Sequence, residues 1–169
     1  MQKMPEVLYE ERKKRVMDAV QLKVPDRVPF MPFFNFFHAK YGGITCQEAM
    51  YDYDKLATAA KRTITDFEPD MYNNPFVLVA LGPTLEALDC KYLMWPGGGL
   101  PAHHPYQFVE KEYMQADEYD LLINNPFDFS LRHFTPRTWG AFEPLAKIPP
   151  FRSYQGLPER LMAMCQDPE

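Results

Sequence analysis

Proline is the residue that most restricts what this chain can fold into. Seventeen of its 169 residues are proline, about twice the usual share of roughly 5%. Because proline lacks an N–H group and has a fixed φ, it interrupts helices and central strands alike. The chain therefore cannot form a long helical bundle, and we expect short elements joined by shaped loops. Its hydrophobic fraction of 46% is sufficient for a core, which excludes a globally disordered chain.

Charge and cysteine content exclude several classes of protein. The chain has 18 basic and 23 acidic residues, a net charge of −5, and lacks the basic stripe of a nucleic-acid-binding protein. Cys46, Cys90 and Cys165 form no CxxC pair, and their odd number favours reduced thiols in a cytoplasm. The longest apolar run, 76–81, is far shorter than the ~20 residues of a membrane span. We therefore expect a cytoplasmic protein that binds neither nucleic acid nor membrane.

Helix and strand signals alternate along the chain. Thr45 and Glu48 match a capping box, which predicts a short helix ending near Met50. Asp52 or Asp54 is expected to cap the next helix. This alternation predicts an α/β architecture. We expect helices over 6–22, 46–50, 54–67, 77–88 with a break or restart at 82–83, 116–125, 127–146 and, just beginning, 157–164; the extended or strand-like segments are 27–37, 69–72, 92–95 and 106–114.

The order of several segments resembles the N-terminal part of the uroporphyrinogen decarboxylase superfamily. The resemblance is based on four segments: the opening helix before Arg27-Val28-Pro29, the helix leading into Pro69-Asp70, the segment 92–97 and the acidic helix start 114–120. Members of that family are (β/α)8 barrels of about 250 residues. The resemblance implies that 1–169 is a single partial domain, the N-terminal portion of a TIM barrel, incomplete and with loop insertions. A complete small α+β domain is the alternative that length alone leaves open.

The resemblance also indicates a substrate pocket. The decarboxylases carry Met-Arg-Gln-Ala-Gly-Arg after their first strand, and those arginines hold substrate carboxylates. When the motif is aligned from Pro29, Phe34 and His38 occupy the positions of its two arginines, and Asn35 occupies the position of its glutamine. An aspartate that follows the second strand in the decarboxylases is replaced here by Asn73-Asn74. The catalytic residues stay unknown and are expected beyond residue 169. The candidates for the pocket are Phe34, Asn35, His38, Tyr72, Asn73 and Asn74.

Each polar candidate also has a purely structural interpretation. His38 either faces the active-site end of a barrel or packs among Phe36, Phe37 and Tyr41, and the sequence favours neither. Asn73-Asn74 precedes a proline and is a turn signal as well as a pair of pocket groups. A pocket role is slightly favoured for this pair.

The superfamily also includes corrinoid-dependent methyltransferases, whose zinc ligands lie in the C-terminal half of the barrel. No three His or Cys residues here have zinc-ligand spacing, so we expect no metal or cofactor in this chain, and zinc and a corrinoid only in a full-length parent. Because both arginines are absent, corrinoid-linked methyl transfer is favoured over tetrapyrrole decarboxylation. A non-catalytic binding module is the third alternative. The expected partners are a small molecule or a corrinoid protein and a second copy of the chain; the isolated chain is expected to be inactive.

Overall fold

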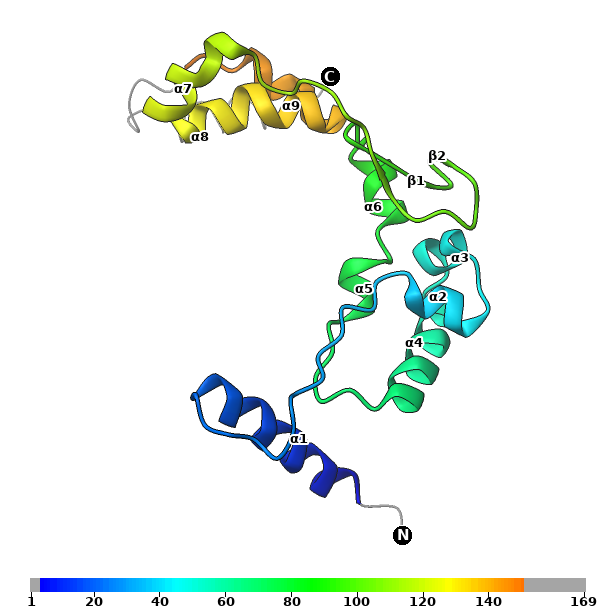
Figure 1. The fold of residues 1–169 in the computed structure, drawn as a ribbon. Helices are drawn as coiled ribbons and strands as arrows, with labels where there is room; N and C mark the ends of the chain where they lie inside the picture. The colour runs from blue at the N-terminus through cyan, green and yellow to red at the C-terminus, as the bar shows by residue number, and fades with distance from the viewer. Residues whose placement is uncertain (1–3, 151–169) are drawn as a thin grey trace, which may run out of the picture. The chain divides into compact units, whose positions relative to one another are not determined.

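A computed structural model describes residues 4–150, and it is a mixed α/β structure in which helices predominate (Figure 1). Within these residues the chain divides into two compact units, one formed by 4–86 and 94–107 and the other by 87–93 and 108–150. No helix of the described part is both long and apolar enough to cross a membrane.

The first unit is mainly helical. Its core includes Met50, Leu56, Val79 and Trp95, each at most 7% exposed. Its helices are α1 (Pro5–Val20), α2 (Phe37–Gly42), α3 (Cys46–Tyr51), α4 (Tyr53–Phe67), α5 (Pro75–Leu78) and α6 (Gly82–Ala87), the last reaching into the second unit.

A small sheet has the strand order β2-β1-β3. Its strands are β1 (Leu93–Pro96), β2 (Gly99–Leu100) and β3 (Gln107–Phe108). β1 pairs with β2 in the register Trp95–Gly99 and Pro96–Leu100. The strand expected at 92–95 is thereby confirmed, whereas only two residues of the extended segment expected at 106–114 are in a strand.

The second unit consists of short helical segments, as the sequence predicted for 116–146. Glu118 and Arg137 form a two-pronged ion pair with both N–O distances 2.6 Å. Asp128 and Arg132 form another, also at 2.6 Å. The segments are a 3₁₀ turn (Ala116–Glu118), α7 (Tyr119–Asn124), α8 (Pro126–Phe129), a π-helical turn (Ser130–Phe134), α9 (Thr135–Thr138) and a 3₁₀ stretch (Gly140–Lys147).

Local capping signals are confirmed. The Thr45 hydroxyl accepts from the Glu48 N–H at 2.9 Å and the Glu48 carboxylate accepts from the Thr45 N–H at 2.8 Å. Asp52 caps α4 by accepting from the Lys55 N–H at 3.0 Å. Gly82-Pro83 restarts the helix, since α6 begins at Gly82. The helix expected at 157–164 lies outside the described residues.

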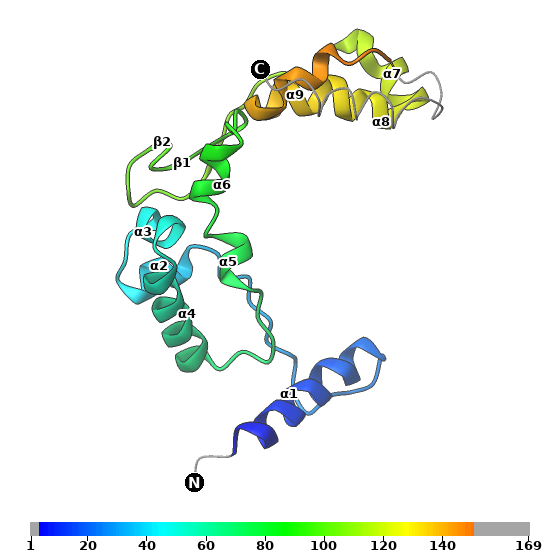
Figure 2. The same ribbon diagram turned by 180° about the vertical axis from the view of Figure 1, so that it is seen from behind.

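The strands expected at 27–37 and 69–72 are wrong, since neither segment is assigned to a strand. Both are extended and run side by side in the same direction, one leading from α1 to α2 and the other from α4 to α5 (Figures 1 and 2). One backbone hydrogen bond joins them, from the Asp70 N–H to the Phe30 carbonyl at 2.8 Å. Pro29 and Pro32 have no N–H to donate, so no regular ladder forms there.

Candidate functional site

Two polar side chains after the first extended segment each have a buried atom that is left unpaired, although only His38 is buried as a whole residue. Asn35 precedes α2 with a left-handed φ of 42°, and His38 lies in its first turn with 2% of its surface exposed. Asn35 Oδ1 and His38 Nδ1 have no hydrogen-bond partner within the described part of the chain. Because a buried polar atom without a partner costs about 1–3 kcal/mol, these atoms are suited to meet a ligand or water.

A cluster of aromatic rings lies beside His38. The His38 ring lies 5.0 Å from the Phe34 ring, and Phe34 in turn contacts Phe37 at 5.7 Å and Phe67 at 6.0 Å, all between centroids. Tyr41 completes the cluster at 5.1 Å from Phe67. The imidazole therefore packs against an aromatic ring, that of Phe34, and still has an unpaired nitrogen, while its position at the active-site end of a barrel stays a prediction.

Burial also sets the charge of His38. Desolvation lowers the pKa of its imidazole below the ordinary 6.5, because the charged form loses hydration that no neighbour replaces. The imidazole is therefore neutral at pH 7, with one nitrogen able to donate and the other to accept a hydrogen bond.

We expect His38 to make the chain less stable in mild acid. Below pH 6.5 the unfolded chain takes up a proton at His38 that the folded chain does not. The free energy of unfolding therefore decreases as the pH is lowered, by up to about 1.4 kcal/mol per pH unit, until the lowered pKa of the folded state is reached. Urea unfolding at pH 7.5 and 5.5 measures this, with His38→Phe, which keeps a ring but cannot titrate, as the comparison. Equal pH dependence in both proteins would show that His38 contributes nothing.

The second group of candidates follows the second extended segment. Asn74 caps α5, its Oδ1 accepting from the Phe76 N–H at 3.0 Å, so the turn interpretation is correct for this residue. Asn73 is half-buried and Tyr72 is 48% exposed. Tyr72 and Asn74 also line a groove of about 630 Å³ against the Lys61 face of α4. Within residues 4–150 no hydrogen bond or ring contact joins this group to Asn35 or His38, although both groups follow neighbouring parallel segments at the same end (Figure 1).

The nearby arginines are already occupied. Arg15, 8% exposed, donates to Asp26 through Nε and Nη2, both at 2.7 Å, and through Nη1 to Asp70. Arg27 donates to Asp70 at 2.7 and 2.8 Å. The hydrogen bonds from Arg15 lower the pKa of Asp26 to about 2. Neither guanidinium is available for a substrate carboxylate at Asn35 and His38.

Sequence reasoning missed this ion-pair cluster, in which residues far apart in sequence meet. Asp70, whose side chain is fully buried, is 43 residues from Arg27 and 55 from Arg15. The signal was nevertheless present, because Arg27 and Asp70 are both among the residues that carry the family resemblance.

Residues 4–150 contain no group of three His, Cys, Asp or Glu side chains arranged to hold a metal ion. His103 and His104 are exposed, and Cys46 donates to the His103 carbonyl at 3.4 Å. Comparison of the chain with protein-family models, with curated proteins and with solved structures finds no match in any of the three.

The chain is expected to retain less than one zinc ion per molecule after dialysis against a weak chelator, because tight binding requires preformed ligand geometry. Metal analysis of the dialysed protein measures this, and Cys46→Ser with His103→Ala tests the nearest His–Cys pair. Stoichiometric zinc in the unsubstituted chain would contradict the expectation.

Proposed function

We propose that this chain is the N-terminal part of an enzyme of the uroporphyrinogen decarboxylase superfamily, from the branch that transfers methyl groups through a corrinoid. The observation that carries the proposal is the pair of neutral, unpaired polar atoms on Asn35 and His38 beside an aromatic cluster. Neutral hydrogen-bonding groups against aromatic walls suit a small methyl donor better than a tetrapyrrole with many carboxylates.

The ion-pair cluster supports the family part of the proposal. It joins the Arg27-Val28-Pro29 segment to Pro69-Asp70, the two short motifs on which the resemblance depends. In a (β/α)8 barrel, consecutive strands are parallel neighbours, and the segments that hold these motifs run parallel and adjacent (Figure 1). A pairing of this kind would explain why both motifs occur together.

The charges support methyl transfer over decarboxylation. Polycarboxylate substrates require guanidinium groups, which bind carboxylates in a two-pronged geometry. Here Phe34 and His38 stand at those positions, His38 is neutral, and Arg15 and Arg27 are held by aspartates. In the proposed enzyme Asn35 and His38 orient the methyl donor, and the rings of Phe34 and Phe37 exclude water from it.

The proposal assigns zinc and the corrinoid to parts of the parent enzyme outside residues 4–150. In the direction tested below, a corrinoid protein would receive the methyl group from the small donor, and the zinc would bind the thiolate that is released when the donor is a methylated thiol. Residues of this chain would bind and orient the donor and would not supply metal ligands.

The product of the complete reading frame tests the proposal. It is incubated anaerobically with cob(I)alamin and, in turn, methylated thiols, amines and alcohols, and the absorbance change to methylcob(III)alamin is followed. We expect turnover with one donor class, and a fall in kcat/KM of about tenfold or more for Asn35→Ala and His38→Leu, while the exposed-site control His104→Ala is unchanged. No methyl transfer with any donor would refute the proposal.

A further inference from the structure

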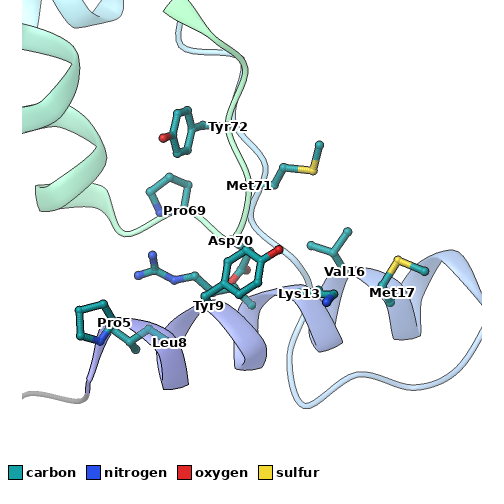
Figure 3. A pocket seen from close by; sticks show the side chains of 11 residues that line it. Pro5, Leu8, Tyr9, Lys13, Val16, Met17, Pro69, Asp70, Met71 and Tyr72 are labelled. Carbon is teal, nitrogen blue, oxygen red and sulfur yellow. The ribbon is translucent and has the colours of Figure 1, made fainter. Parts of the chain in front are cut away.

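A second concave site lies between α1 and residues 69–72, away from Asn35 and His38 (Figure 3). Its volume is about 620 Å³, within the range of roughly 300–1,000 Å³ of small-molecule sites. Leu8, Val16 and Met17 line it from α1, and Met71 and Tyr72 line it from the facing segment. Met17, Met71 and Tyr72 are between 44% and 48% exposed, so this apolar surface is open to a ligand.

The charge at this groove is positive. Asp70 is its only acidic lining residue, and both of its oxygens are engaged by Arg15, Arg27 and the Phe30 N–H. Because two guanidinium groups neutralise this carboxylate, it does not repel an anion. Arg12 and Lys13 also line the groove.

Arg12 is the cation best placed to hold a ligand. It is half-buried and pairs with no carboxylate within residues 4–150, where Asp18 is bound by Lys14 and Asp26 by Arg15. Lys13 is only loosely paired, 3.9 Å from Glu10, with both side chains more than half exposed. Its ammonium group lies 5.6 Å from the centre of the Tyr9 ring.

We propose that this groove binds a small amphiphilic anion, a carboxylate or sulfonate joined to an apolar or aromatic body. The acid group pairs with Arg12, and the body lies on Leu8, Met17 and Met71. A concave site with one free guanidinium among apolar side chains fits this chemistry, whereas a helix that lies on a membrane surface presents a continuous apolar face to the lipid. This inference is independent of the methyl-transfer proposal, since it uses neither Asn35 nor His38.

Two probes that share one body separate charge from apolar contact. 8-Anilinonaphthalene-1-sulfonate is the anion, and N-phenyl-1-naphthylamine is the same body without the sulfonate. Fluorescence titration of the chain is expected to show saturable binding of both. Arg12→Gln should raise the Kd of the sulfonate about tenfold, the value of one charge-assisted hydrogen bond, and leave the Kd of the amine unchanged. Lys14→Gln, an exposed residue of the same helix paired with Asp18, is the matched control and should change neither.

Met71→Glu tests the location of the site. An added carboxylate in the groove should abolish binding of the sulfonate, while far-UV and near-UV circular dichroism show that the fold is kept. Sulfonate binding that survives both Arg12→Gln and Met71→Glu would overturn the proposal. So would binding of the chain to phosphatidylglycerol vesicles that Arg12→Gln weakens as strongly as it weakens the probe, since that would assign the cation to a membrane surface.

Discussion

Replacing Asp70 with asparagine is expected to lower the free energy of unfolding by about 3 kcal/mol, near the lower end of values for breaking a buried ion pair. The Asp70 side chain is fully buried and accepts hydrogen bonds from Arg15, from Arg27 and from the Phe30 N–H. Asparagine keeps the shape but loses the negative charge and one acceptor oxygen. Arg15, 9% exposed at its side chain, is then left with Asp26, which is 65% exposed.

Chemical unfolding followed by circular dichroism measures this loss. Asp66→Asn is the matched control, since its carboxylate is 44% exposed and makes a longer ion pair of 3.7 Å with Arg62. An exposed pair of that kind contributes about 0.5 kcal/mol or less. If the Asp70 and Asp66 variants lost equal stability, the cluster would have no special role in the fold.

The Asp70 contribution also has a defined pH dependence. Burial by itself raises the pKa of Asp70, but the hydrogen bond from the Phe30 N–H and the two arginines outweigh burial, so the net pKa lies below the ordinary 3.8. A lowered folded pKa means that the stabilisation is fully present above the unfolded pKa and is lost as pH falls through the folded value. The difference between the parent chain and Asp70→Asn should therefore be constant from pH 7 to 5 and shrink below pH 4.

Local signals account for what the sequence predicted well. The helix expected at 6–22 is observed over Pro5–Val20, and the helices after Thr45 and Asp52 begin where their capping residues predict. A cap is satisfied by backbone groups two or three residues away, so the sequence contains both partners. The same holds for Gly82-Pro83, where a missing N–H marks the start of a helix.

Long-range contacts account for what the sequence did not predict. A strand needs a partner in register. Within residues 4–150, the aromatic run at 30–37 is joined to the neighbouring extended segment by hydrogen bonds between Phe30 and Asp70. The ion pairs that Arg15 and Arg27 form with Asp70 join segments more than forty residues apart, beyond any helical or strand period. Glu118 was interpreted as an acidic helix start, yet Arg137 binds it through two hydrogen bonds and lowers its pKa to about 2.

The candidate site also combines features that the local sequence predicts with features that depend on long-range packing. The extended backbone before Asn35 and His38 follows from local chemistry, as does the turn at Asn74. The unpaired atoms of Asn35 and His38 could not be read from sequence, because burial of a polar atom depends on everything packed around it. The cluster formed by Phe34, Phe37 and Phe67 depends on α4, thirty residues further along the chain.

Under the proposed family membership, in which Phe34 and His38 take the positions of two substrate-binding arginines, the enzyme is expected to decarboxylate uroporphyrinogen at least about a thousandfold more slowly than a true decarboxylase. Two missing guanidinium contacts of about 2 kcal/mol each correspond to roughly that factor. Phe34 offers an apolar ring to a substrate carboxylate, and His38 is neutral because burial lowers its pKa. Asn73 and Asn74 bring no negative charge to stabilise a protonated pyrrole intermediate, which weakens transition-state binding as well.

An anaerobic assay that follows coproporphyrinogen by chromatography measures this rate, with an authentic decarboxylase as the positive control. A binding titration of the 169-residue chain with uroporphyrin separates the two causes of a low rate. Weak binding would assign the loss to the absent cations, whereas tight binding without turnover would assign it to the amides that replace the aspartate. Rapid turnover would contradict both arguments, because it would require cations from elsewhere in the parent enzyme to hold the carboxylates that Phe34 and His38 leave unpaired.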